Sequence, residues 1–307
     1  MIVYLTTRRS SNIFRYLFRD WARSLRKTLV RATYEEIVER GSIPRATIVF
    51  TDHERMSPDL LGLARQLWDQ VSPHCRALNN PHTVLTRVPL LHSMFEAGIN
   101  EHRAFRPDDV PADLRYPVFV RGANDHLGPR TDLLEDREAL ERALVRLAVQ
   151  DDPCDDLLVV EYEDCRGGDG CYRKFAAFRV GDAIIPRHQI VGDHWALKVV
   201  SPHFATRAEE ECSYANENPH ADQAMRAFEI AGIEYGRIDY GWVDGRIRVW
   251  EINTNPTVMS DLYRTKRSRR PLQRLFLERF LAAMADLETT PEGPDIPLAF
   301  HAPTLPR

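Results

Sequence analysis

The stretch YGRIDYGWVDGRIRVWEINTNP, residues 235 to 256, decides the fold. Two β-rich runs flank Asp244-Gly245, and Asp-Gly between such runs is a strong hairpin signal. The second run ends in WEINTNP, where a carboxylate and two amides stand beside a proline. A purely structural strand would end on glycine, aspartate or serine. The pattern therefore indicates a strand end that also supplies oxygen ligands.

The polar side chains of this hairpin come in two pairs. Residues two apart share a strand face, so Arg237 and Asp239 form one pair and Glu251 and Asn253 form the other. Whether the two pairs lie on the same face depends on the register of the hairpin, and the length of the loop sets the register.

We expect a three-residue loop, 243–245. A two-residue loop would place Asp239 opposite Trp250 and send the pairs to opposite faces. A three-residue loop places Glu251 opposite Arg237 and requires glycine at its third position, which the sequence supplies. All four polar side chains then converge on one face, and isoleucine and tryptophan fill the other.

The converging oxygen atoms indicate a magnesium site. Asp239, Glu251 and Asn253 are hard oxygen ligands, which suit Mg²⁺ far better than zinc. Protein-bound magnesium usually completes its octahedron with phosphate oxygens, and an arginine nearby would neutralise charge on a transferred phosphoryl group. The structural alternative is that Glu251 and Arg237 form a cross-strand ion pair while Asn253 caps a turn.

The order R-x-D, hairpin, E-x-N-x-x-P closely resembles the last block of the ATP-grasp superfamily, particularly the D-alanine:D-alanine ligases and the ribosomal-protein glutamate ligases. The resemblance implies that Asp239, Glu251 and Asn253 bind two Mg²⁺ ions, with Mn²⁺ as a substitute. It also implies that Arg237 contacts the phosphoryl or acyl-phosphate oxygens. Asn255 stands where the D-alanine ligases prefer serine, and its role is open.

Other segments follow the family's order over roughly Asn79 to Met259. They are ALNNPHTVLTRVPLLHSMFEAGIN, PVFVRGANDHLGPRT, LLVVEYED and RKFAAFRVGDAIIPRH, which begin at residues 77, 117, 157 and 173. The resemblance implies that ATP is held by residues of these segments, namely Arg87, Arg121, Gly122, Glu161, Tyr162, Glu163 and Lys174. It further implies phosphate or substrate contacts, and hence a part in catalysis beside Arg237, for Arg187 and Lys198.

Two positions depart from the family's pattern. ATP-grasp enzymes commonly use lysines where Arg87 and Arg121 stand, and arginine offers a planar fork instead of a compact charge. The loop GANDHLG, from residue 122, also has fewer small residues than the usual phosphate-covering loop. The sign of the charge is kept, and the geometry is not.

Composition is that of a soluble globular protein, with 43% hydrophobic and 28% charged residues among 307. The net charge of −4 gives no reason to expect nucleic acid or an anionic membrane as the main partner. No apolar run approaches the roughly 18 residues that span a bilayer. The first residues place a β-like run before arginines, unlike a secretory signal. Five scattered cysteines indicate reduced thiols, so we expect a cytoplasmic protein with no fixed oligomeric state readable from its sequence.

The pattern of runs predicts an α/β protein of ATP-grasp architecture. We expect an N-terminal open α/β domain over 1–80, a linker helix and central lobe over 81–160, and a C-terminal lobe with the metal site over 161–288. A proline-rich tail, 289–307, is expected to be poorly ordered. Apolar residues at 14, 17, 18, 21 and 25 have the spacing of an amphipathic helix, and Ser57-Pro58 is a helix-start signal.

Two further signals carry weaker expectations. The run YRTKRSRR, residues 263–270, holds five basic residues just beyond the metal motif, which suits an acidic substrate or simply a solvated loop. Among the histidines, His126 inside the glycine-containing loop is the one worth testing for function.

We therefore expect an ATP- and Mg²⁺-dependent carboxylate–amine ligase that forms an amide or peptide bond through an acyl phosphate. Its substrates would be small-molecule or peptide acids and amines. A small-molecule kinase of the same fold is an alternative, because some relatives phosphorylate hydroxyl groups. A non-catalytic ATP-binding module is another, because arginines stand at the two lysine places.

Overall fold

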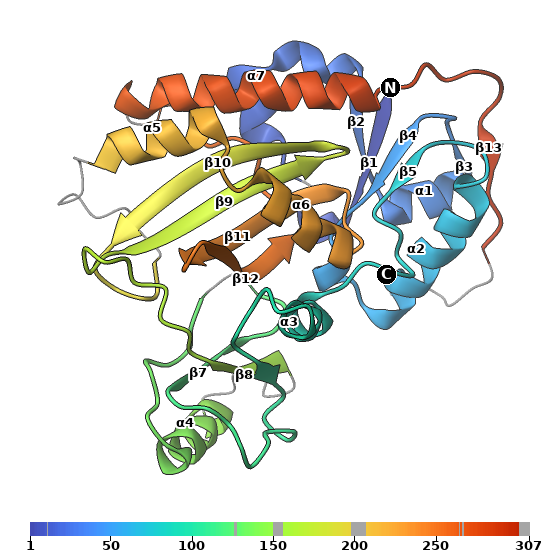
Figure 1. Cartoon of the computed structure of the whole chain (residues 1–307). Helices are drawn as coiled ribbons and strands as arrows, with labels where there is room; N and C mark the ends of the chain where they lie inside the picture. The colour runs from blue at the N-terminus through green and yellow to red at the C-terminus, as the bar shows by residue number, and fades with distance from the viewer. Residues whose placement is uncertain are drawn as a thin grey trace.

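The computed structural model describes residues 1–10, 12–125, 128–149, 156–197, 207–263, 265 and 267–300. Three sheets of three or four strands organise these residues, and a two-stranded ribbon ties the C-terminal segment to the N-terminal part. Figure 1 shows the N-terminal four-stranded sheet beside the C-terminal four-stranded sheet, with the three-stranded sheet and helix α4 (Arg137–Val149) set apart from both. None of the described helices combines the length and apolarity needed to cross a bilayer.

The N-terminal domain is a parallel sheet in the order β2-β1-β4-β5. Its strands are β1 (Ile2–Thr6), β2 (Leu29–Thr33), β4 (Thr47–Phe50) and β5 (Ala77–Leu78). Two helices, α1 (Tyr34–Arg40) and α2 (Pro58–Val71), cover one face and share a hydrophobic core with it. Helix α2 begins where predicted, because the Ser57 side chain accepts a hydrogen bond from the backbone N–H of Leu60 at 3.3 Å.

The expected amphipathic helix over 14–25 is wrong as one continuous element. The segment between β1 and β2 forms three short turns, η1 (Arg8–Ser10), the π-helical η2 (Leu17–Trp21) and the 3-10 helix η3 (Arg23–Lys27). Its apolar side chains are still directed inward. The chain turns out of the helix at residue 22, with φ of −145°, and the preceding Trp21 donates from its indole N–H to the Ser260 carbonyl at 2.9 Å. Tertiary contacts thus override the local periodicity.

The central lobe is the antiparallel sheet β6-β8-β7 with helix α4 packed against it. Its elements are β6 (Ala104–Phe105), β7 (Val118–Gly122), α4 (Arg137–Val149) and β8 (Leu157–Glu161). Helix α3 (Arg87–Glu96) precedes them and ends at Gly98, which has a positive φ of 67°. Leu90 and Met94 of α3 are buried in the core of the C-terminal lobe, so this helix lies between the lobes and is not simply part of the central one.

The C-terminal lobe is built on the antiparallel sheet β10-β9-β11-β12. Its strands are β9 (Tyr172–Val180), β10 (Ala183–Gly192), β11 (Tyr235–Val243) and β12 (Arg246–Asn253), and its helices are α5 (Ala208–Glu217), α6 (Ala221–Ile230) and α7 (Arg270–Leu287). Alternating side chains divide strand β9. Phe178 packs on α7 and the N-terminal domain, and Phe175 packs on the opposite core with α6. Figure 1 shows α7 running along this sheet.

The hairpin loop has two residues, which corrects the expected three-residue loop. Val243 pairs with Arg246, and both loop residues have positive φ, 50° at Asp244 and 76° at Gly245. The register then shifts at Trp250, so that Asp239 pairs with Glu251 and not with Val249. A β-bulge therefore supplies the extra residue that a longer loop was expected to supply, and it returns the two acidic residues to one face.

The segment after α7 packs on the N-terminal domain, although it was expected to be poorly ordered. Strand β13 (Ile296–Pro297) pairs with β3 (Ser42–Ile43), and Ile296 is 3% exposed in the N-terminal core. An ion pair between Arg40 and Asp295, at 2.6 Å, supports the contact. The prediction of poor order is therefore wrong for 289–300, and residues 301–307 lie outside the described part.

Two further short turns among the described residues are η4 (His53–Arg55) and η7 (Arg267–Arg269).

Candidate active site

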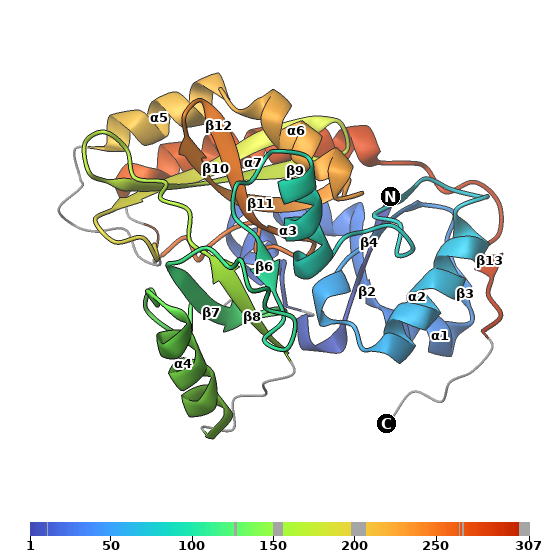
Figure 2. The ribbon, with the colours of Figure 1, turned by 60° about the horizontal axis from the view of Figure 1, so that its bottom comes forward.

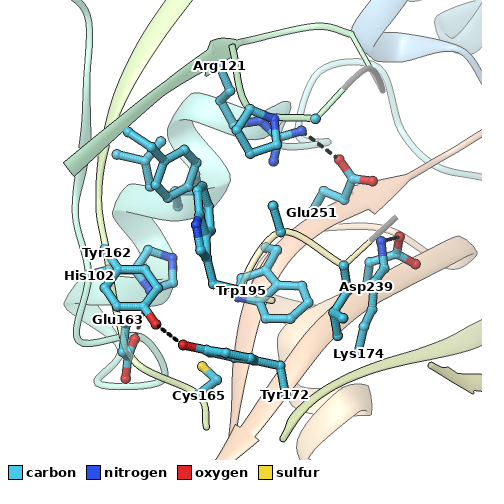
Figure 3. A pocket seen from close by; sticks show the side chains of 18 of the residues that line it. His102, Arg121, Tyr162, Glu163, Cys165, Tyr172, Lys174, Trp195, Asp239 and Glu251 are labelled. Atoms are coloured by element: carbon cyan, nitrogen blue, oxygen red, sulfur yellow. Dashed lines mark hydrogen bonds and ion pairs between the residues drawn. The ribbon is translucent and has the colours of Figure 1, made fainter. Parts of the chain in front are cut away.

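A cavity of about 470 Å³ lies between the central sheet and the C-terminal sheet. Figure 2 shows the two sheets on either side of this region, and Figure 3 shows the side chains that line it. The predicted site residues in its wall are Arg121, Glu161, Tyr162, Glu163, Lys174, Arg237, Asp239 and Glu251. The convergence of the two hairpin pairs is thereby confirmed for three of their four side chains.

Asp239 is held by two cations. It is 2% exposed, with Lys174 Nζ at 2.7 Å from one carboxylate oxygen and Arg237 Nε at 2.9 Å from the other. Lys174 comes from β9, the strand that lies beside β11, and Arg237 stands two residues before Asp239 on the same strand face. The predicted proximity of Arg237 and Asp239 thus takes the form of a buried ion pair.

Glu251 is also held by two cations, and both come from outside the C-terminal lobe. Arg87 at the start of α3 donates to its carboxylate, and Arg121 of β7 lies 3.2 Å from the same oxygen. Figure 3 shows Arg121 directed toward Glu251 across the cavity. The other terminal nitrogen of Arg87, Nη1, donates to three backbone carbonyls, those of residues 122, 123 and 125, at 3.0, 2.7 and 2.9 Å. Arg87 therefore fastens the glycine-containing loop to the hairpin.

Charge at this end of the cavity is strongly positive. Among the described residues, four cations, Arg87, Arg121, Lys174 and Arg237, pair with two carboxylates, which leaves a surplus of two positive charges in this group. Burial, followed by the repulsion from Arg87, lowers the pKa of Arg121. Such a surplus is costly in a partly desolvated cleft unless an anion joins it. The arrangement therefore suits a polyanionic ligand such as a triphosphate.

The residues present fit magnesium by their chemistry. Asp239 and Glu251 stand directly opposite each other on adjacent strands, and cross-strand neighbours have Cβ atoms about 5 Å apart. The Asn253 side-chain oxygen accepts a hydrogen bond from the Asn255 backbone at 2.8 Å. In the described part of the chain no three His, Cys, Asp or Glu side chains are grouped to hold a metal by themselves. Two carboxylates and an amide oxygen are hard oxygen ligands, which suit an ion that also binds phosphate oxygens, as magnesium does.

Gly122 leaves room for the side chain of Asp125 in the loop after β7. A Cβ atom at this position would overlap the Asp125 carboxylate, which is an ion-pair partner of Arg130 at 2.8 Å. Gly128 and Pro129 then bring the loop to the rim of the cavity. The loop is predicted to cover phosphates, and two of its residues, His126 and Leu127, lie outside the described residues.

The opposite end of the cavity is aromatic. The Tyr162 hydroxyl lies 2.9 Å from that of Tyr172, and its ring meets Trp195 with centroids 5.9 Å apart. Trp195 also packs on Phe119, with centroids 4.9 Å apart. Aromatic and apolar walls of this kind suit a planar heterocycle such as a nucleobase.

Glu163 lines this end and is held by three groups. His102 Nδ1 lies 2.8 Å from its carboxylate, Arg248 donates to it, and the backbone N–H of Glu101 is 3.3 Å away. Because the Asn100 amide donates to the other ring nitrogen of His102 at 3.2 Å, we assign the proton of the neutral ring to Nδ1. Burial alone would raise the pKa of Glu163, but the bonds from His102 and Arg248 outweigh it and lower that pKa.

Glu161 is bound within the protein. It is 2% exposed, and both oxygens accept hydrogen bonds from the side chains and backbones of Arg103 and Arg115. Burial would raise the pKa of this carboxyl, yet the hydrogen bonds from the two arginines prevail and lower it to about 2. Glu161 thus ties the segment before β7 to strand β8.

Arg187 occupies a second β-bulge. The register of β10 shifts between Pro186 and His188, so Arg187 is the extra residue, and its guanidinium stacks on Phe276 at 4.6 Å. Burial, then the repulsion from Arg237 and Arg269, lowers the pKa of Arg187 to about 9. His188 lies beside it in the wall of the cavity. Arg187 itself is not among the residues that line the cavity, so its positive charge lies behind the wall, near Arg237.

Several predicted site residues lie away from the cavity wall. Arg87, Gly122 and Asn253 stand directly behind it, through the contacts described above. The Asn255 side chain bonds Tyr4 and Thr6 of the N-terminal domain at 2.7 and 3.0 Å, which gives this position a structural role. Lys198, and Arg264 and Lys266 of the basic run, lie outside the described residues.

The sequence did not single out several wall residues, namely His102, Cys165, Tyr172, His188, Trp195 and Trp250. Tyr172 stands two residues before Lys174, so strand alternation could have found it. Trp250 was expected on the opposite face and reaches the wall because of the bulge. No pattern in the sequence indicates that Cys165 lines the cavity. Burial raises the pKa of its thiol to about 12, so the thiol stays protonated and unreactive.

Comparison with known proteins defines the fold. No family model matches the sequence, and no curated protein matches it. The D-alanine–D-alanine ligase of Bacillus anthracis is similar in structure, with a TM-score of 0.50, 12% identity, and coverage of 93% of this chain and 98% of that chain. A RimK-domain ATP-grasp protein of Sphaerobacter thermophilus has a TM-score of 0.47, 16% identity, and coverage of 92% and 100%. The chain has the ATP-grasp fold, as its sequence predicts.

Proposed function

We propose that the protein is an ATP- and Mg²⁺-dependent carboxylate–amine ligase. One observation carries the proposal. Four cations converge on two opposed carboxylates, Asp239 and Glu251, at one end of a cavity whose other end is aromatic. This arrangement suits a nucleotide whose base lies against Tyr162 and whose phosphates lie among the arginines. The ATP-grasp fold, shared with a D-alanine–D-alanine ligase, agrees with it at the level of fold.

The reaction we propose has two steps. An oxygen of the acid substrate attacks the γ-phosphorus of ATP, the bond from that phosphorus to the bridging oxygen breaks, and ADP leaves. The nitrogen of an amine then attacks the acyl carbon, phosphate leaves with the electron pair of the C–O bond, and the nitrogen loses a proton. Positioning and charge stabilisation dominate such a transfer, and no covalent bond to the enzyme is needed.

The chain's own residues divide the work. Arg237 and Lys174, now paired with Asp239, would turn toward the oxygens of the transferred phosphoryl group. Arg121 would contact the phosphates from the side of the central lobe. Asp239, Glu251 and Asn253 would hold magnesium, which when bound neutralises phosphate charge. Arg187, stacked on Phe276, would bind an oxygen of the acid substrate.

A non-catalytic ATP-binding module is the second candidate, and one observation favours it. The guanidinium of Arg87 binds three backbone carbonyls and Glu251. The resemblance to ATP-grasp enzymes places a phosphate-binding lysine at this position. The position therefore serves the loop and not the nucleotide. The proposal of a ligase requires that Arg121 and Lys174 suffice for the phosphates.

A trapping assay separates the candidates. The protein is incubated with ATP, Mg²⁺, single carboxylic acids and hydroxylamine, which converts an acyl phosphate into a hydroxamate. A ligase releases ADP and forms hydroxamate in equal amounts, and only with its own acid. A kinase forms a stable phosphorylated product and no hydroxamate, whereas a binding module releases no ADP with any acid.

Matched variants test the residues in the same assay. Asp239→Asn and Glu251→Gln should lower the rate of ADP release at least a hundredfold, because the metal and phosphates lose a ligand. Asp222→Asn and Glu229→Gln change the same groups on the exposed face of α6 and should leave the rate unchanged. Equal rates of ADP release in the test variants and the control variants would show that Asp239 and Glu251 take no part in the reaction.

A further inference from the structure

A second hollow, of about 320 Å³, lies on the N-terminal domain and shares no residue with the central cavity. It is lined by Asn12, Phe14, Arg15, Phe18, Arg19, Arg26 and Arg31. These residues come from the turns between β1 and β2 and from β2 itself. The proposed ligase reaction uses none of them.

This part of the chain concentrates positive charge. Residues 8–31 include eight basic side chains and one acidic one, whereas the whole chain has a net charge of −4. The acidic residue, Asp20, is paired with Arg19 at 2.5 Å, and Arg19 also reaches Asp261 at 3.2 Å. Within the described residues, the side chains of Arg15, Arg26 and Arg31 form no ion pair or hydrogen bond. The hollow therefore gathers three arginines without an anionic partner.

Aromatic rings pack against two of these three arginines. Arg26 stacks over Phe18 at 5.3 Å, and Arg15 stacks over Tyr16 at 5.8 Å. Phe18 in turn packs on Phe14, which is 2% exposed, with centroids 5.4 Å apart. A guanidinium stacked by its face keeps its N–H edge available, and that edge matches carboxylate or phosphate oxygens in pairs.

Strand β2 completes the wall. Arg31 stands two residues after Leu29, and Leu29 is buried in the same core as Phe14. Strand alternation therefore directs Arg31 toward the turns that carry Arg15 and Arg26, and away from helices α1 and α2. Residues separated in sequence thus meet in one concave site with an aromatic base.

We propose that this hollow is an anion-binding site for a small molecule that carries two or more phosphate or carboxylate groups. Its size suits a small ligand, and the three arginines supply several paired N–H donors within one concavity. The site is independent of the proposed ligase reaction, because it stands on other residues. It adjoins the segment after β12, since Arg19 pairs with Asp261 and Asp20 accepts from the Leu262 N–H at 3.3 Å.

Calorimetric titration with inorganic pyrophosphate, and separately with citrate, tests the site at fixed ionic strength without nucleotide or metal. The test variant is Arg26→Gln with Arg31→Gln. The control is Arg23→Gln with Lys27→Gln, which removes the same charge from exposed positions of the same segment outside the hollow. We expect the affinity of one class of anion sites to fall at least tenfold in the test variant and less than twofold in the control.

The two anions and a third variant complete the test. Tighter binding of pyrophosphate identifies phosphate as the preferred group, and tighter binding of citrate identifies carboxylate. Titration with ATP and Mg²⁺ should be unchanged in the test variant, which separates the hollow from the central cavity. Arg15→Gln, at an exposed position, serves if the double variant unfolds at a lower temperature than the native protein. Equal weakening in test and control, or no binding of either anion to the native protein, would overturn the proposal.

Discussion

At the scale of single residues, Arg87 shows what an arginine does at a position where the sequence predicted a nucleotide contact. Its guanidinium donates to three loop carbonyls and to Glu251, and the residue is 7% exposed. An ammonium group has three donors and no planar fork, so lysine cannot make the same set of contacts. The arginine therefore joins the loop after β7 to the hairpin.

Arg87→Ala should lower the free energy of unfolding by about 3 to 5 kcal/mol, because it leaves a buried carboxylate and several carbonyls without their donor. Chemical denaturation measures this change. Arg142→Ala is the control, since Arg142 pairs with Glu138 on the exposed face of α4 and such pairs contribute only about 0.5 kcal/mol. A loss for Arg87→Ala no larger than that of the control would show that the joint does not exist.

The lowered pKa of Glu161 predicts that the stability of the protein depends on pH. The pKa of its carboxyl is lowered from 4.5 to about 2, so the folded state binds this proton less readily than the unfolded state does. Its contribution to stability is therefore complete above about pH 5 and disappears as the pH falls toward 2. We expect Glu161→Gln to destabilise the protein by about 3 kcal/mol at pH 7.

Urea denaturation of the native protein and Glu161→Gln from pH 7 down to pH 3 measures this difference. The gap between the two proteins should narrow below about pH 5 as the native carboxylate loses its advantage over the unfolded one. A gap that stays constant over this range would mean that the carboxylate is not held by Arg103 and Arg115.

At the scale of elements, the hairpin shows what the sequence predicts and what it leaves open. Alternation correctly paired Arg237 with Asp239 and Glu251 with Asn253, because the period of a strand is fixed. The register depends on two features, the loop and a bulge, and a bulge at Trp250 has no local signature. The sequence therefore predicted that the acidic side chains share one face, but it did so from a three-residue loop that the hairpin does not have.

One glycine in the hairpin loop and one in a helix should respond in opposite directions to replacement by alanine. Gly245 has φ of 76° in the hairpin loop, so Gly245→Ala should cost about 1 kcal/mol. Gly62 lies inside α2, and a methyl group at this position would meet no other side chain within 4 Å, so Gly62→Ala should stabilise the protein by about 0.5 to 1 kcal/mol. Thermal unfolding of both variants checks the pair, and a stabilising Gly245→Ala would contradict the two-residue loop.

At the scale of the whole molecule, the site draws on parts far apart in the chain. Arg87 and Arg121 stand 164 and 130 residues before Glu251, and both bind it. The order of segments in the resemblance predicted that these regions meet, but no local pattern shows that the two arginines pair with Glu251. Likewise, the tail was expected to be poorly ordered because proline-rich composition says nothing about a buried isoleucine at residue 296.

Ile296→Ala tests the attachment of that tail. The side chain is buried in the core of the N-terminal domain, and removal of a buried isoleucine costs about 2 to 4 kcal/mol. Val149→Ala is the control, because Val149 is 80% exposed and its change should stay within about 0.5 kcal/mol. Denaturant unfolding compares them, and equal values would show that the tail adds nothing to the core.

The most direct test of the central claim is calorimetric titration of ATP, with and without Mg²⁺, on the native protein, Glu251→Gln and the control Glu229→Gln. We predict that magnesium tightens ATP binding at least tenfold in the native protein and the control, and that this gain is lost in Glu251→Gln. ATP binding that is independent of magnesium in all three proteins would contradict the metal site. Absence of ATP binding to the native protein would contradict the proposed function itself.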